Sequence, residues 1–168
     1  HRTEREYLTI DELRKLAQTP FYNGLLKKAF LFSCFCGLRH SDIIALTWGD
    51  IEMDDDGNFR LYIIQKKTKE AISLPLSQEA IKQLPKREDA KEDDIIFKKL
   101  ITLGRTNEIL PKWAEQAGIK KHITFHTARH THATMLLTLG VDLYTVSKLL
   151  GHTNIQTTQI YAKLVDES

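Results

Sequence analysis

Residues 22–35 constrain the fold more than any other part of the sequence. They are apolar on most faces of a helix, so the helix that they form has to be surrounded by other elements. Pro20 interrupts the chain before this segment, and Gly37 is placed to end the helix. The 168 residues of the chain suit one domain, because domains commonly have about 100–200 residues.

Further helices are indicated by capping residues and by apolar periodicity. Thr9 and Glu12 form a capping box at the start of the first helix. Ser41 and Asp42 resemble the cap and first turn of a short helix. The helices expected besides 22–35 cover 10–18, 41–46, 77–84, 105–117, 125–139, 143–150 and 155–162.

A small sheet is expected in the middle of the chain. Residues 59–64 are rich in β-branched and aromatic side chains, and residues 71–75 form a second strand that ends at proline. The polar segment 65–70 between them predicts a hairpin tip rich in lysine. Another strand is possible before the turn at 54–58. The fold class is therefore α+β, mainly α-helical, in one domain with a small antiparallel sheet.

Composition and cysteine usage exclude several classes. A hydrophobic fraction of 42% with 27% charged residues is that of a globular protein and excludes wholesale disorder. No apolar run reaches the ~18 residues of a membrane-spanning helix. Cys34 and Cys36 are too close together to bridge well and are expected to be core residues, which predicts a reduced, cytoplasmic protein.

The densest polar region lies between residues 122 and 132. Its members are His122, His126, Arg129, His130 and His132. His126 and Arg129 share a helix face near a helix start, where a phosphate would bind well. His126 and His130 have the spacing of a zinc pair, but a third ligand at a familiar spacing is missing. Capped or solvated histidines are the third interpretation.

The other candidate residues have ordinary explanations when each is taken alone. Arg39 could pair with Asp42 in a salt bridge, the lysines of 66–69 could form a solvated turn, and Tyr161 could pack in an amphipathic helix. Residues 146–155 also resemble a helix–glycine–helix DNA-binding unit. That reading leaves Arg39 and the hairpin lysines without a role.

The order of these motifs along the chain is more specific than any one of them. Gly-Leu-Arg at 37–39, a basic hairpin tip, His-x-x-Arg at 126–129 and Leu-Gly-His at 150–152 are followed by Tyr161, nine residues after His152. This series resembles the catalytic domain of the tyrosine recombinases, the phage integrase family. The resemblance covers nearly the whole chain.

The resemblance implies a set of site residues. Its catalytic members are Arg39, Lys67, His126, Arg129, His152 and the nucleophile Tyr161, with Asp42 in support. Lys67 is chosen because the family's lysine typically lies eight residues before the proline that closes the second strand, here Pro75. Lys66 and Lys69 stay open as alternatives. The family often has leucine before the second arginine, where this chain has Ala128.

The resemblance also implies the reaction and its partners. Tyr161 would cleave a DNA phosphodiester to give a 3′-phosphotyrosyl link and a free 5′-hydroxyl, followed by strand exchange and religation with no cofactor, ATP or metal. The partner would be double-stranded DNA at recombination sites. Four protomers would act together in the synaptic complex, with accessory DNA-bending proteins possible and the isolated chain monomeric. A type IB topoisomerase, which religates the same strand, is the alternative enzyme.

Residues 1–168 are expected to be a catalytic domain without the N-terminal core-binding domain that family members usually carry. The sequence begins where the linker between those domains would end, at residues 7–9. A bacterial, cytoplasmic and DNA-associated enzyme of a mobile element is the expected setting.

The net charge of +2 conceals an uneven distribution. Residues 50–56 and 88–94 carry five acidic residues each, with Lys91 among the second group. Outside these two segments, the chain has 23 basic and 12 acidic residues. We predict that both segments are loops that face away from DNA, and that the remaining basic surface neutralises phosphates.

Overall fold

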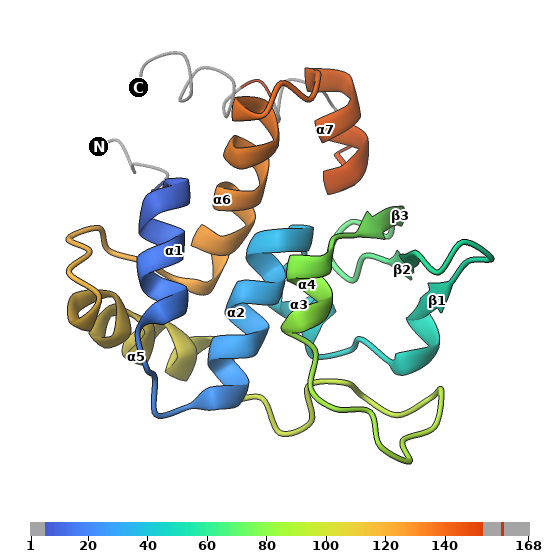
Figure 1. The fold of residues 1–168 in the computed structure, drawn as a ribbon, viewed down its shortest axis with the longest axis horizontal. Helices are drawn as coiled ribbons and strands as arrows, with labels where there is room; N and C mark the ends of the chain where they lie inside the picture. Colours follow the sequence, from blue (N-terminus) through green and yellow to red (C-terminus); the bar gives the residue numbers. More distant parts are fainter. Residues whose placement is uncertain (1–5, 153–158, 160–168) are drawn as a thin grey trace.

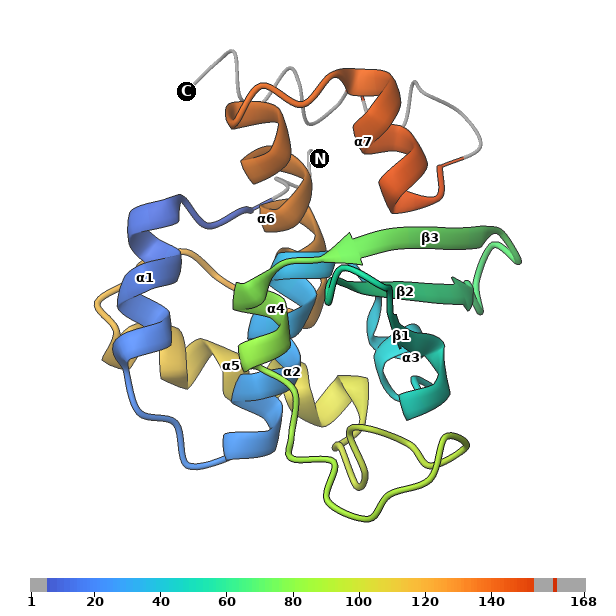
Figure 2. The ribbon, with the colours of Figure 1, turned by 45° about the vertical axis from the view of Figure 1, so that its right-hand side comes forward.

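The computed structural model describes residues 6–152 and Gln159. Helix α2 (Gly24–Cys36) runs through its centre, with α1 and α5 on one side and the sheet on the other, while α6 and α7 lie at one end (Figures 1 and 2). Asn23 caps α2 by accepting from the amide of Leu26, and Gly37 ends it in the left-handed region at φ 79°. The central apolar helix predicted from the sequence is confirmed, with its start shifted by two residues.

The remaining elements agree with the predicted fold class. Their bounds are α1 (Ile10–Gln18), α3 (His40–Ile43), a 3₁₀ turn (Trp48–Asp50), β1 (Ile51–Met53), β2 (Phe59–Ile64), β3 (Ala71–Leu76), α4 (Gln78–Lys82), α5 (Leu103–Gln116), α6 (Phe125–Thr138) and α7 (Leu143–Leu150). The predicted final helix, 155–162, lies outside the described residues apart from position 159. Among the described helices, none has the length and apolar character needed to cross a membrane.

The sheet is antiparallel in the order β1-β2-β3. The second predicted strand was expected to end at Pro75, but β3 continues to Leu76, and Pro75 pairs with Arg60. Proline is tolerated there because β3 is an edge strand. Side chains alternate along β3, so that Ile72, Leu74 and Leu76 are buried. Helix α7 contacts β3, which places the end of α7 beside the hairpin.

The prediction that Ser41 caps a helix at 41–46 is wrong. Helix α3 begins at His40, with Arg39 as its extended N-cap residue, and it ends at Ile43. The left-handed Gly37 turns the chain two residues before Arg39, so the helix starts earlier than the capping pattern indicated. Asp42 lies inside the helix, and its carboxylate accepts from the amide of Lys66 instead of capping.

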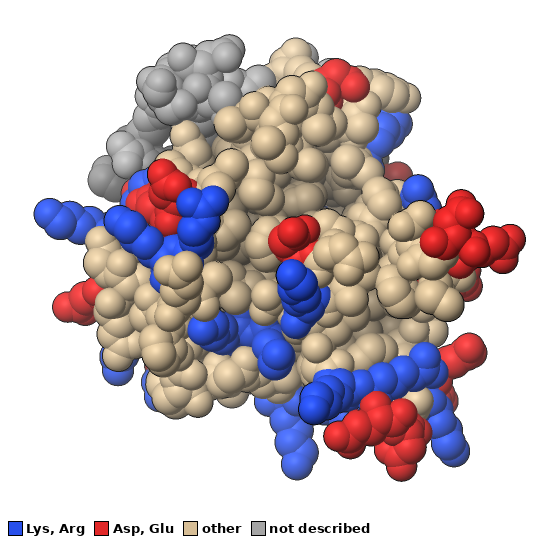
Figure 3. All heavy atoms as spheres, viewed as in Figure 1, with Lys and Arg blue, Asp and Glu red and all other residues tan. Residues whose placement is uncertain are grey.

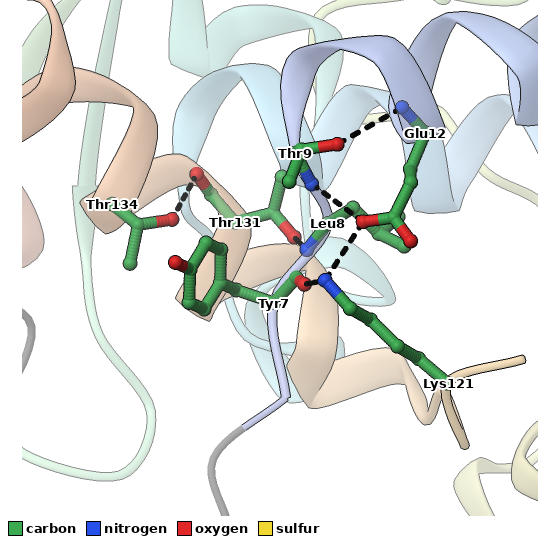
Figure 4. A network of polar contacts seen from close by, with 7 residues as sticks. All are labelled: Tyr7, Leu8, Thr9, Glu12, Lys121, Thr131 and Thr134. Carbon is green, nitrogen blue, oxygen red and sulfur yellow. Dashed lines mark hydrogen bonds and ion pairs between the residues drawn. The ribbon is translucent and has the colours of Figure 1, made fainter. Parts of the chain in front are cut away.

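The first described residues are fastened to α6 (Figure 4). The amide of Leu8 donates to Thr131 Oγ1 at 2.9 Å. Lys121 Nζ donates to the carbonyl oxygen of Tyr7 at 2.8 Å and pairs with Glu12 at 2.7 Å. The predicted capping box holds Glu12 in place, because Thr9 and Glu12 exchange both hydrogen bonds. The Leu8 contact thus ties the start of the described chain to α6, while the Lys121 contacts tie α1 to the segment between α5 and α6.

The predicted core cysteines are buried and unpaired with each other. Cys34 and Cys36 are at most 1% exposed and carry free thiols. Burial is the main reason that the pKa of Cys36 rises to about 12. Both thiols therefore stay protonated near neutral pH and act as small apolar side chains.

Candidate active site

Arg129 on α6 is the centre of the candidate site. Its side chain is buried, with 2% exposure. Nη1 donates to the carbonyl oxygen of Gly37 at 2.7 Å, and Nη2 donates to that of Leu150 at 2.8 Å. Nη2 also lies 3.3 Å from Nε2 of His152. One guanidinium thus joins the end of α2, the end of α7 and the histidine that follows α7.

Gly37 and Gly151 let the chain turn close to this guanidinium. Both have positive φ, 79° and 72°, which a residue with a Cβ rarely adopts. A Cβ at Gly37 would lie 2.7 Å from a ring carbon of His132. The tight turn at Gly37 places Arg39 at the start of α3, while that at Gly151 places His152 beside Arg129.

Asp42 connects the site to the lysine turn, which we define as residues 65–70 between β2 and β3. Asp42 is 3% exposed, and its Oδ1 accepts from the amide of Lys66 at 2.8 Å. Its Oδ2 is buried and has no hydrogen-bond partner within residues 6–152 and 159. Lys67 follows directly and is exposed, as are Lys66 and Lys69.

Gln65 was missed by the sequence reasoning. It is fully buried, and its Nε2 donates to the carbonyl oxygen of Leu150 at 3.0 Å. The period of two along β2 was the available signal, because Leu61, Ile63 and Gln65 fall on the inward-facing side. A polar residue on that side of a strand end needs a partner.

The predicted site residues are partly gathered by the described chain. Contacts of Arg129 bring together His152 and the turn that precedes Arg39, and Asp42 fixes the beginning of the lysine turn. His126 is exposed near the start of α6. Its ring meets that of His130 edge-on, with the two ring centroids 4.6 Å apart. Tyr161 lies outside the described residues.

His126 and His130, interpreted above as a possible zinc pair, have no third metal ligand beside them among the described residues. Within the part of the chain that the structure describes, no three His, Cys, Asp or Glu side chains are grouped so that they could hold a metal ion. The edge-on contact of the two rings instead packs them against each other.

The comparison with protein families decides what kind of chain carries this arrangement. The phage integrase family model matches residues 6–168. The chain belongs to the phage integrase family.

Individual relatives of this phage integrase family member are tyrosine recombinases. It is 32% identical to tyrosine recombinase XerC of Chlamydia caviae, over 92% of its own length and 53% of the relative. It is 34% identical to tyrosine recombinase XerD of Listeria monocytogenes serotype 4b, over 92% of its length and 56% of the relative. The chain therefore spans about half the length of these relatives.

Solved structures share the phage integrase fold seen here. The XerA recombinase matches with a TM-score of 0.79 at 22% identity, over 99% of this chain and 63% of the other. A lambda integrase fragment in a dimer bound to a core site matches with a TM-score of 0.74 at 23% identity, over 96% of this chain and 60% of the other. At these identities the likeness concerns the fold.

His132 is a buried histidine behind the candidate site. His132 packs against Gly37, and its Nδ1 donates a hydrogen bond to the carbonyl oxygen of Cys34 at 3.1 Å. Burial, and secondarily the charge of Arg129, lowers the pKa of His132 from 6.5 to about 4. The imidazole is therefore neutral in the folded state at pH 5, whereas it is mostly protonated in the unfolded state.

The free energy of unfolding is expected to fall as the pH is lowered from 7.5 to 5. In this window the unfolded state binds more protons at His132 than the folded state, so stability decreases by about 2 kcal/mol. Urea unfolding at both pH values measures this loss. The loss of stability between pH 7.5 and 5 should be smaller in His132→Gln than in the wild type. It should be unchanged in His122→Gln, because His122 is exposed. The same loss in His132→Gln and in the wild type would contradict the assignment to His132.

Proposed function

We propose that this chain is the catalytic domain of a site-specific DNA recombinase, with Tyr161 as the nucleophile. The observation that carries the proposal is the buried Arg129, whose contacts hold His152 and the turn before Arg39 against α6. A guanidinium with fixed hydrogen bonds on one side keeps its orientation for a phosphate on the other. Arg39, His126, Arg129, His152 and Lys67 are proposed as the residues that act on the phosphate.

The residue types suit transfer of a DNA phosphoryl group to a phenol. Negative charge gathers on the non-bridging oxygens in the transition state, and two arginines offer forked, permanently charged donors there. Tyrosine has an ordinary pKa of about 10 and is a poor nucleophile at neutral pH. His126 and His152 add donors, and His126 is proposed to assist proton transfer from the phenol.

Lys67 is proposed as the general acid. The bond from Tyr161 Oη to phosphorus forms while the bond from phosphorus to the 5′ oxygen breaks, and the proton of Lys67 goes to that oxygen. The reaction retains the bond energy in the phosphotyrosyl link, so a 5′-hydroxyl from a partner strand can reverse it. The proposed cycle therefore uses neither ATP nor a metal ion.

Double-stranded DNA is the proposed partner, and four protomers are proposed to exchange strands between two sites. Related structures support this, since they include an XerH recombinase bound to its difH substrate and a lambda integrase dimer bound to a core site. We propose further that residues 1–168 belong to a longer protein with a DNA-gripping N-terminal domain. A cytoplasmic location in a bacterium, a mobile-element role and accessory DNA-bending proteins are parts of the same proposal.

The charge distribution fits a DNA-binding surface elsewhere than on the two acidic segments. Residues 54–56 and 91–93 are exposed. Acidic side chains gather at the β1–β2 turn and on the long loop after α4 (Figure 3), both of them away from α6 and α7 in Figure 1. The proposed DNA site at α6, α7 and the lysine turn therefore avoids these acidic side chains.

A trapping experiment tests the proposed function. The full-length product of the gene is incubated with nicked duplexes of random sequence, and covalently captured DNA is selected to give the cognate site. We expect a protein–DNA adduct that survives a denaturing gel. Binding to the cognate site without any adduct would support a non-catalytic helix–turn–helix module. Religation of one strand without partner exchange would support the topoisomerase.

A further inference from the structure

Gln65 occupies the point where β2 ends and the lysine turn begins. Its side chain is fully buried, in contrast with the exposed residues 66–69 that follow. Nε2 donates to the carbonyl oxygen of Leu150 at 3.0 Å, and Oε1 accepts from Thr68 Oγ1 at 2.6 Å. Since both ends of the amide are bonded, its orientation is fixed.

The acceptor of Gln65 is also an acceptor of Arg129. The carbonyl oxygen of Leu150 accepts one hydrogen bond from Nη2 of Arg129 at 2.8 Å and another from Nε2 of Gln65. His152, two residues further along, lies against the same Nη2. A single backbone oxygen therefore joins the lysine turn to the buried arginine and to the histidine beside it.

The space around Gln65 is shaped for this contact. A Cβ at Gly151 would lie 2.6 Å from Oε1 of Gln65 and 3.0 Å from its amide carbon. The amide thus packs against the bare Cα of Gly151, which has a positive φ of 72°. The turn at the end of α7 and the side chain of Gln65 fit each other closely.

The two residues that flank Lys67 are each held by a different anchor. The amide of Lys66 donates to Asp42, and the hydroxyl of Thr68 donates to Gln65. The turn is closed by a bond from the amide of Gln65 to the carbonyl oxygen of Glu70 at 2.8 Å. Asp42 therefore ties the turn to α3, while Gln65 ties it to the end of α7.

We infer that Gln65 is a positioning residue that fixes the lysine turn relative to Arg129 and His152. It would act through Lys67, by holding that lysine where its ammonium protonates the departing 5′ oxygen. The inference rests on the proposed function and adds to it a residue outside the set of charged and nucleophilic groups.

A change of leaving group separates positioning of the acid from a general structural effect. A 5′-bridging sulfur at the scissile phosphate leaves as a thiolate, whose conjugate acid has a pKa of about 8.5, and it needs no proton from an acid. A variant that misplaces Lys67 should be slow on the oxygen substrate and nearly normal on the sulfur substrate. A variant that loosens the whole site should be slow on both.

The experiment measures single-turnover cleavage by the full-length protein on its cognate duplex with oxygen or sulfur at the scissile position. Gln65→Met keeps a similar side-chain length but removes both polar atoms. We expect its cleavage of the oxygen substrate to fall about 10- to 100-fold, less than the roughly 100- to 10,000-fold that a general acid contributes, because Lys67 is displaced and not removed. Its cleavage of the sulfur substrate should stay near the wild-type rate. Thr68→Val, on the exposed turn, should give a smaller loss with the same rescue.

Lys67→Ala and Gln78→Leu are the controls. Lys67→Ala should show the complete leaving-group defect with rescue by sulfur, whereas Gln78→Leu, at an exposed position on α4, should match the wild type on both substrates. Equal losses on the two substrates in Gln65→Met and Thr68→Val, or no loss in either, would overturn the inference. If the sulfur substrate does not rescue Lys67→Ala, then Lys67 is not the general acid and the inference about Gln65 falls with it. A wild-type protein that forms no adduct would instead overturn the proposed function.

Discussion

Tyr161→Phe is expected to form no covalent adduct with DNA, a fall of at least about 1,000-fold in cleavage rate. The substitution removes one oxygen atom, and in the proposed reaction that oxygen forms the bond to phosphorus. The ring that remains has no atom that can attack phosphorus. Labelled nicked duplex resolved on a denaturing gel measures the adduct, and fluorescence anisotropy on the same duplex should report unchanged DNA binding.

Tyr22→Phe is the matched control for this experiment. Tyr22 is 75% exposed in the segment before α2, outside the proposed DNA site, and its ring meets that of Phe21 edge-on. The loss of its hydroxyl should leave both adduct formation and DNA binding at wild-type levels. An adduct in Tyr161→Phe that forms as fast as in the wild type would show that another residue is the nucleophile.

Arg129 substitutions are expected to lower both cleavage and stability. Arg129→Ala removes the donors to the buried carbonyl oxygens of Gly37 and Leu150, of which the second keeps Gln65 as a donor. A buried acceptor left without a partner costs about 1–3 kcal/mol, and the cavity adds to this loss. We expect the free energy of unfolding in urea to fall by about 2–5 kcal/mol.

Arg129→Lys separates the role in cleavage from the role in folding. Lysine keeps the charge, but its compact ammonium lacks the planar fork that reaches Gly37 and Leu150 at once. We expect a smaller loss of stability than in the alanine variant and a fall in cleavage of about 100-fold or more, comparable to the loss of one preorganised donor. Rates are compared at a temperature where circular dichroism finds each variant folded.

Arg14→Lys provides the comparison on the surface. Arg14 pairs with Asp11 on α1, and its side chain is 65% exposed. Its replacement should change neither stability nor cleavage, because exposed ion pairs contribute little. Wild-type cleavage by a folded Arg129→Lys protein would contradict the catalytic assignment of Arg129.

Local signals in the sequence predicted most of the elements. The capping box of Thr9 and Glu12 acts over three residues, and Gly37 and Gly151 end helices through their own backbone conformation. Such features can be predicted from the sequence because the interacting groups are neighbours in the chain. The start of α3 was misplaced because Ser41 resembled a cap, whereas the helix begins at His40. Asp42, predicted in the first turn, uses its carboxylate for the amide of Lys66, 24 residues away.

The interior of the site depends on contacts that no local pattern encodes. Arg129 reaches Gly37 across 92 positions, and Gln65 reaches Leu150 across 85. The family resemblance named Arg129 because its motif is short and fixed. It did not name Gln65, since a neutral amide in a basic turn carries no chemical signature by itself and becomes significant through the carbonyl oxygen that it meets.

The choice of acceptors for Arg129 bears on how such a site tolerates mutation. Its two carbonyl partners belong to the main chain at Gly37 and Leu150, so no loss of a side chain can remove them, although the conformation at position 37 requires glycine. Substitution at position 150 alters packing but cannot delete the oxygen. Side chains around Arg129 can therefore change during evolution while its two carbonyl acceptors are retained, provided that the backbone path is kept. This independence from side-chain identity is consistent with the persistence of the fold in a recombinase that is only 22% identical.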